Sequence, residues 1–190
     1  LVMLSTLKDS YQSPNLFFGL LLCMQGAMNG VFVSLDLVTY YMFWELSLIP
    51  AYFLVIMWGK KPIMNTGLKF FFYTLIGSLF MLAAIIYLGV SAGSTDVTSI
   101  YGAEISGATQ LWIYVGFMLA YGIKIPIFPL HTWQPNTYQL SPTPVTMMLS
   151  AVMLKMALYS IIRWIIPVVP EALSQYGIYV LGLAAFGILY

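Results

Sequence analysis

The chain has 190 residues, of which 61% are hydrophobic and only 7% are charged, and its formal net charge is +1. A soluble domain carries about a quarter charged residues, so this composition excludes a water-soluble globular protein and indicates an integral membrane protein. The scattered basic residues argue against a nucleic-acid partner, and the single Cys23 excludes a disulfide framework and a thiolate metal site. Because the chain starts and ends without a leader or a polar terminus, we expect an internal fragment of a longer protein.

Six apolar segments are long enough to cross, or begin to cross, a hydrocarbon layer of ~30 Å, which takes about 20 helical residues. The connections between most of them are short, as in antiparallel helix neighbours, and the Gly/Ser-rich stretch 91–107 is the longest polar one. We therefore predict an all-α, polytopic transmembrane helix bundle in which residues 1–190 form a single transmembrane domain. The six segments are 16–34, 37–58, 68–90, 111–139, 143–166 and 175–190.

Basic residues indicate how the bundle is oriented, because Lys and Arg near helix ends collect on the cytoplasmic side. Lysines flank the second connection, which we place inside, whereas the third connection carries acidic residues alone and is placed outside. The lysines are Lys60, Lys61 and Lys69, and Lys8 before the first segment agrees with them.

The second segment carries Glu45, about 12 Å from the outer start of its helix at ~1.5 Å per residue. Pro50 has no N–H to offer to the Leu46 carbonyl, so an acceptor is freed beside the carboxylate. An ionisable group near the bilayer middle is costly and predicts a functional site, the alternative being a static interhelical ion pair. Asp36, at the start of the same segment, is expected to cap the helix rather than to admit ions.

The fourth segment is a broken helix with a lysine at the break. Lys124 lies roughly 20 Å from the outer start of the segment. Pro126 and Pro129 follow it, and two prolines three residues apart should stop the helix. Unpaired backbone groups in hydrocarbon cost several kcal/mol each, so such a break requires protein or a water-filled cavity around it. A lysine at this position predicts a site of ion translocation.

Two further groups could take part in moving protons. Lys155 lies about 18 Å from the inner start of the fifth segment, and the i, i+4, i+8 spacing places Tyr159 and Arg163 on its face. We interpret Lys155 as a buried base, the alternative being a lysine that reaches to the interface. His131 is the only histidine, and imidazole exchanges a proton near neutral pH, so it could relay protons between the two lysines. The alternative is a hydrogen-bonded core histidine.

Three stretches carry a resemblance to a known family: FWELSLIPAYFLVIMWG (43–59), KFFFYTLIGSLFML (69–82) and GIKIPIFPLHTWQPNTYQLSPTPVTMMLSAVMLKMALYSIIRW (122–164). They resemble the antiporter-like membrane subunits of respiratory complex I (NADH:quinone oxidoreductase), above all the type called subunit M in bacteria and subunit 4 in mitochondria. The resemblance runs through nearly the whole chain. It implies one five-helix antiporter-like repeat followed by the start of the next.

The resemblance also implies a function, namely proton translocation driven by quinone reduction in other subunits. Glu45 matches the family's glutamate, Lys124 its partner lysine, Lys155 the lysine of the central hydrophilic axis, and His131 the histidine of the HTW segment. No cofactor and no metal are expected in this chain, whereas NADH, flavin, iron–sulfur clusters and quinone are expected in partner subunits. The implied partners are other complex I membrane subunits, the lipid bilayer and protons, without nucleic acid, in a bacterial plasma membrane.

The chain departs from the family pattern after HTW, where Gln134 to Tyr138 replace the usual LPDAH and remove a carboxylate and a second histidine. Two other readings stay open. One is a D-type subunit of a multisubunit sodium/proton antiporter, or the related membrane subunit of an energy-converting hydrogenase. The other is a structural anchor without pumping activity, which is disfavoured because the glutamate, both lysines and the histidine are all present.

Overall fold

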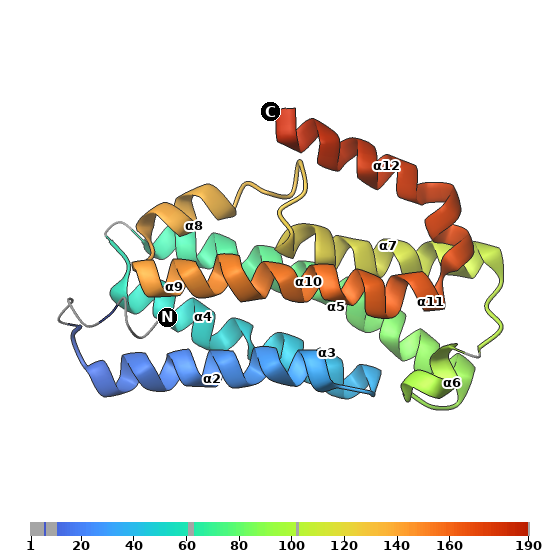
Figure 1. Ribbon diagram of the computed structural model, residues 1–190, viewed down its shortest axis with the longest axis horizontal. Coiled ribbons are helices and arrows are strands. Elements are labelled where there is room, and N and C mark those ends of the chain that lie inside the picture. The colour runs from blue at the N-terminus through green and yellow to red at the C-terminus, as the bar shows by residue number, and fades with distance from the viewer. Residues whose placement is uncertain (1–5, 7–10, 61–62, 102, 190) are drawn as a thin grey trace.

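The computed structural model describes residues 6, 11–60, 63–101 and 103–189, and its long helices run mostly along one direction (Figure 1). All regular elements among these residues are helical, which confirms the all-α prediction. Lys8 and Lys61 lie outside the described residues, so the orientation drawn from them stays a prediction. The helices are α2 (Pro14–Val33), α3 (Leu37–Leu46), α4 (Leu48–Trp58), α5 (Met64–Ala92), α6 (Val97–Tyr101), α7 (Gly107–Lys124), α8 (Gln134–Leu140), α9 (Thr143–Met148), η1 (Leu149–Met153), α10 (Leu154–Ser160), η2 (Ile161–Ile165), α11 (Ile166–Val168) and α12 (Pro170–Leu189).

Five stretches of the described chain are long and apolar enough to cross a membrane, and each matches one of the predicted segments. They are α2, the pair α3 and α4, α5, the continuous helix from α9 to α11, and α12. The remaining predicted segment contains α7, which is shorter because it stops at the predicted break. The polar connection 91–107 differs from the expected loop, since α6 forms within it.

The second span is interrupted at Ser47, between α3 and α4. Pro50 lacks the N–H that would bond to the Leu46 carbonyl, so the regular helix cannot continue through this turn. The Ser47 hydroxyl instead donates to the Trp44 carbonyl at 2.7 Å. The interruption therefore lies two residues after Glu45, where the sequence predicts a freed acceptor.

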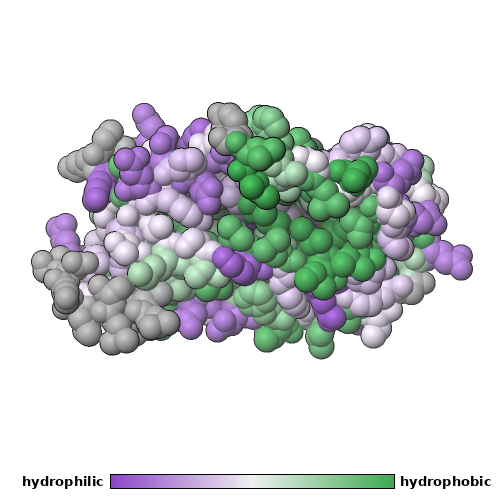
Figure 2. Space-filling model, turned by 45° about the horizontal axis from the view of Figure 1, so that its top comes forward, coloured by the Kyte–Doolittle hydropathy of each residue, from purple (hydrophilic) through white to green (hydrophobic). Residues whose placement is uncertain are grey.

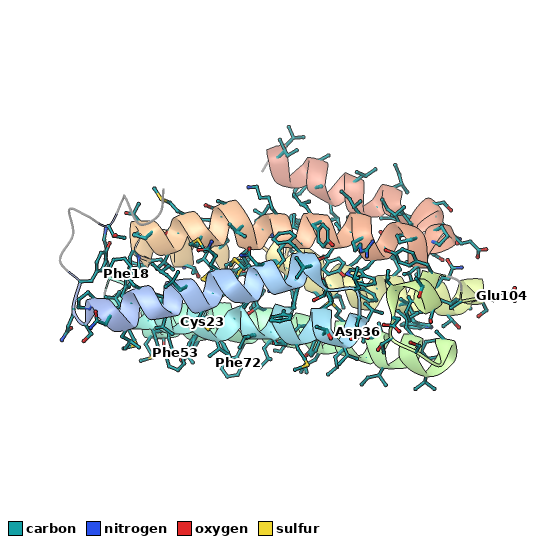
Figure 3. All side chains as sticks on the ribbon, turned by 60° about the horizontal axis from the view of Figure 1, so that its bottom comes forward. Phe18, Cys23, Asp36, Phe53, Phe72 and Glu104 are labelled. Atoms are coloured by element: carbon teal, nitrogen blue, oxygen red, sulfur yellow. The ribbon has the colours of Figure 1, made fainter. Side chains whose placement is uncertain are left out.

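Two connections at one end of the bundle pair with each other. The Leu37 amide donates to the Thr95 carbonyl at 3.0 Å, and the Val97 amide donates to the Leu35 carbonyl at 2.9 Å. Figure 3 labels Asp36 at this point and Glu104 beyond it, at the end of the molecule. The pairing ties the start of α3 to the end of α5.

Asp36 caps α3, as the sequence predicts. Its carboxylate accepts from the Thr39 amide at 2.7 Å and from the Thr95 hydroxyl. Two effects act on the pKa of Asp36. Partial burial is the largest single one and raises the pKa, because it favours the neutral acid. The hydrogen bonds together outweigh burial and hold the pKa below its usual value. Asp36 thus lies outside the apolar spans and stabilises a helix start.

The close packing of α5 against α7 positions the lysine at the break. Gly116 makes this contact possible, because a Cβ at that position would lie 2.8 Å from the Phe80 carbonyl oxygen.

The outer surface is apolar: Figure 2 shows hydrophobic residues across the middle of the visible face and hydrophilic ones towards its two ends. Phe53 and Phe72, labelled in Figure 3, are 42% and 52% exposed. Such a surface fits contact with lipid or with other membrane helices.

Candidate functional site

The helix break at Lys124 is confirmed. α7 ends at Lys124, residues 125–133 form successive turns, and α8 begins at Gln134. We call residues 125–133 the break segment. In Figure 1 it is the irregular stretch that joins α7 to α8. Pro126 and Pro129 account for it, since neither can donate to a helical carbonyl.

Protein groups satisfy several of the backbone atoms that the break leaves free. The Trp133 indole Nε1 donates to the Ile123 carbonyl at 2.8 Å, inside the protein. Lys69, on α5, donates from Nζ to the Thr132 carbonyl at 2.9 Å. The sequence predicts for Lys69 only an anchoring and orienting position at a helix end, so this hydrogen bond to the break was missed. The break is thus held against α5 and the end of α7, as a membrane-embedded break requires.

The Lys124 ammonium is buried at the end of α7, with 3% of the residue exposed. Its Nζ makes no hydrogen bond and lies 3.9 Å from the centroid of the Trp44 ring. Glu45, the next residue after Trp44, acts on it electrostatically, and the Glu45 Oε1 is buried without a hydrogen bond. The structure therefore brings the predicted glutamate and lysine into one site, but with the ammonium on an indole face rather than hydrogen-bonded to the carboxylate.

A buried cluster of aromatic side chains surrounds this contact. The Trp44 ring packs against both Tyr40 and Tyr121, at 5.7 and 5.4 Å between centroids. The Tyr40 hydroxyl donates to Ser160 Oγ at 2.7 Å and lies 3.1 Å from the Tyr121 hydroxyl. All of these residues are at most 1% exposed. We call Tyr40, Trp44, Tyr121 and Ser160 the aromatic cluster; sequence reasoning missed it, although Tyr121 precedes Lys124 by about one helical turn.

Lys155 is not part of this site. It is exposed on the described chain, and its Nζ donates to the Ser150 carbonyl of η1 at 3.0 Å. Its predicted companions turn elsewhere, because the Tyr159 hydroxyl donates to the Phe32 carbonyl and the Arg163 guanidinium lies 5.7 Å from the Tyr101 ring. Lys155, Tyr159 and Arg163 thus make separate contacts. The role of Lys155 stays a prediction.

His131 lies in the break segment and is partly buried. Its ring stacks on that of Phe128, with 5.6 Å between centroids and 27° between planes. The Gln134 amide donates to its backbone carbonyl at 2.9 Å, which helps to start α8. The histidine therefore follows Lys124 at the break, and its relay role also stays a prediction.

Comparison with known proteins finds one matching family and many relatives. A family model described as "NADH:quinone oxidoreductase/Mrp antiporter, TM" matches residues 34–190. A relative named "NAD(P)H-quinone oxidoreductase chain 4 1", from Picosynechococcus sp., is 37% identical over 181 residues, covering 94% of this chain and 34% of the relative. The chain thus spans about a third of the length of the curated relatives that it matches.

Solved structures share the fold. A chain of respiratory complex I from Thermus thermophilus with bound NADH matches with a TM-score of 0.86 and 33% identity, over 92% of this chain and 38% of that one. A chain of the Mrp complex from Dietzia sp. matches with a TM-score of 0.74 and 24% identity, over 83% of this chain and 18% of that one. The second likeness concerns the fold alone.

Proposed function

Since the chain belongs to the family of NADH:quinone oxidoreductase and Mrp antiporter membrane domains, we propose that it is part of a proton-translocating subunit of an NADH:quinone oxidoreductase. The names of its relatives and the likeness to a complex I chain at 33% identity support this choice. In this proposal, protons cross the membrane while quinone is reduced elsewhere in the complex. NADH, flavin, iron–sulfur clusters and quinone belong to partner subunits, and the chain lies among other membrane subunits in a bacterial plasma membrane.

The observation that carries the proposal is the buried Lys124 ammonium, which makes no hydrogen bond and is subject to the charge of Glu45. A charge at this depth is costly and is usually kept for a task. Each member of such a pair favours the charged form of the other, so a change in their separation changes the proton affinity of both. When Glu45 and Lys124 approach, the lysine holds its proton; when they separate, the proton can leave.

The proton released by Lys124 needs an acceptor, and we propose His131 and then Lys155. His131 follows Lys124 in the break segment, and Lys155 lies on the next long helix of the chain. Water is the expected link between these groups, because a break in a membrane helix is tolerated beside a water-filled cavity. Exposure of Lys155 on the described chain leaves it open to contact with further helices of a longer subunit.

Replacement of Lys124 or Glu45 by Ala in the full-length subunit tests the proposal. Both variants should assemble but lose most of their proton pumping, together with quinone reduction coupled to it. Lys60→Ala is the matched control, since Lys60 is an exposed lysine outside the spans and should leave pumping unchanged. Normal pumping by an assembled Lys124→Ala complex would contradict the proposal. Normal pumping by Lys155→Ala would contradict the relay alone.

A second function, sodium/proton antiport, is favoured by the family description, which names the Mrp antiporter. The two functions differ in their need for sodium. A complex I subunit should pump protons in sodium-free vesicles during quinone reduction, whereas an antiporter subunit should move protons only against sodium. A third possibility, a structural anchor, predicts that Lys124→Ala and Glu45→Ala change neither process.

A further inference from the structure

The contact between Lys124 and Trp44 is not explained by the pairing of Lys124 with Glu45. The ammonium lies 3.9 Å from the indole centroid, well within the ~6 Å at which a cation is attracted to the electron-rich face of a ring. Tryptophan is the strongest aromatic partner for a cation, and the attraction grows when both are removed from water, as they are here. The ammonium makes no hydrogen bond, so the indole face takes the place of a hydrogen-bond acceptor.

The aromatic cluster holds the indole in place. Tyr40 packs on one part of Trp44 and Tyr121 on another, and the hydroxyls of both tyrosines are tied to Ser160 of α10, directly or through each other. The ring is 1% exposed. Because three helices fix its neighbours, the indole face presents a defined position to the end of α7.

We propose that Trp44 is a positioning residue for ion translocation, whose indole face holds the Lys124 ammonium in a resting position apart from the Glu45 carboxylate. The inference deepens the proposed function and rests on it. In the resting position the indole face stabilises the charged lysine without a hydrogen bond to Glu45. Each movement of the Lys124 ammonium towards or away from the Glu45 carboxylate therefore starts from the same place. Trp44 itself exchanges no proton.

Fluorinated tryptophans at position 44 test this role in the full-length subunit, assembled in its complex and reconstituted in vesicles. Fluorine withdraws charge from the ring face and changes the ring size little, so a series with one, two and four fluorines weakens only the attraction for the cation. The measurement is the pH dependence of proton pumping during quinone reduction. A less stabilised ammonium loses its proton more readily, so the alkaline midpoint should fall stepwise by about one pH unit across the series, which corresponds to about 1.4 kcal/mol.

Other titratable groups stay constant in this series. Glu45 on α3 is the charged group that acts electrostatically on Lys124. Tyr40 on α3 and Tyr121 on α7 are the tyrosines of the aromatic cluster, and neither is changed. The matched control is the same fluorine series at Trp164, which is also 1% exposed, packs on Tyr40 and has the Arg163 guanidinium 5.7 Å from its ring centroid. That series weakens a cation contact that does not involve Lys124, so it should leave the midpoint where it is.

Three results decide the matter. A stepwise fall at position 44 and none at position 164 supports the inference. A flat series at position 44, in complexes where Lys124→Ala abolishes pumping, overturns the role of Trp44 and leaves the proposed function standing. Normal pumping by Lys124→Ala overturns the proposed function and the inference with it.

Discussion

The indole of Trp133 holds the helix break together, and Trp133→Phe should show how strongly. The indole Nε1 donates at 2.8 Å to the Ile123 carbonyl, one residue before the end of α7. Phenylalanine removes this donor and leaves a buried carbonyl without its partner, which costs about 1–3 kcal/mol. It also removes ring volume from a residue that is 2% exposed. The two effects can be separated with a second tryptophan.

Trp164 provides the matched control, since it is 1% exposed and its Nε1 is buried without a hydrogen bond. Trp164→Phe removes the same ring volume but no hydrogen bond, and it keeps an aromatic ring beside the Arg163 guanidinium, which lies 5.7 Å from the Trp164 centroid. The difference between the two variants should therefore be about 2 kcal/mol in the free energy of unfolding. Thermal unfolding of the full-length subunit in detergent measures it. Equal midpoints, or a lower one for Trp164→Phe, would refute the reasoning.

Three further changes test other contacts of the fold. Lys69→Met removes a hydrogen bond to the break segment, so hydrogen exchange there should rise about tenfold, and Lys69→Arg should restore part of the protection. The pKa of the Asp36 carboxyl is held below its ordinary value in the folded protein. The ionised carboxylate therefore stabilises the fold above the unfolded-state pKa, and this stabilisation is lost as the pH falls through the folded-state pKa. Asp36→Asn removes the carboxylate and should flatten the decline of the unfolding midpoint below about pH 4. Gly116→Ala places a Cβ 2.8 Å from the Phe80 carbonyl and should destabilise by about 1–3 kcal/mol, while Gly182→Ala, with nothing within 4 Å, should not lower the unfolding midpoint.

The features that could be predicted from the sequence are those set by local chemistry. Pro126 and Pro129 stop a helix wherever they occur, so the end of α7 at Lys124 followed directly. Pro50 likewise predicted a freed acceptor near Glu45, and the structure interrupts the span at Ser47. The apolar segments were predictable because length and hydrophobicity alone decide whether a helix can cross a membrane.

The features that escaped prediction depend on contacts between distant parts of the chain. Tyr40 and Ser160 are 120 positions apart, and no periodicity indicates that their side chains meet. The contact of Trp44 with Lys124 is of the same kind, because an aromatic residue in an apolar run reads as ordinary packing. The short α6 was missed since a polar, Gly/Ser-rich stretch favours a loop until neighbouring residues tie its start.

The two π-helical turns on either side of α10 put its side chains out of phase with those of the flanking helices. A π-turn holds one more residue than an α-turn, and each residue of an α-helix advances the side chain by about 100° around the axis. Arg163 lies within the second of these turns, so counting in fours from Lys155 misjudges the direction in which it points. Winding the same five residues, Leu149–Met153, as a regular α-helix would swing Lys155 through about a quarter of a revolution relative to α9. The direction in which Lys155 points from the helix axis thus depends on the one extra residue that the preceding π-turn holds.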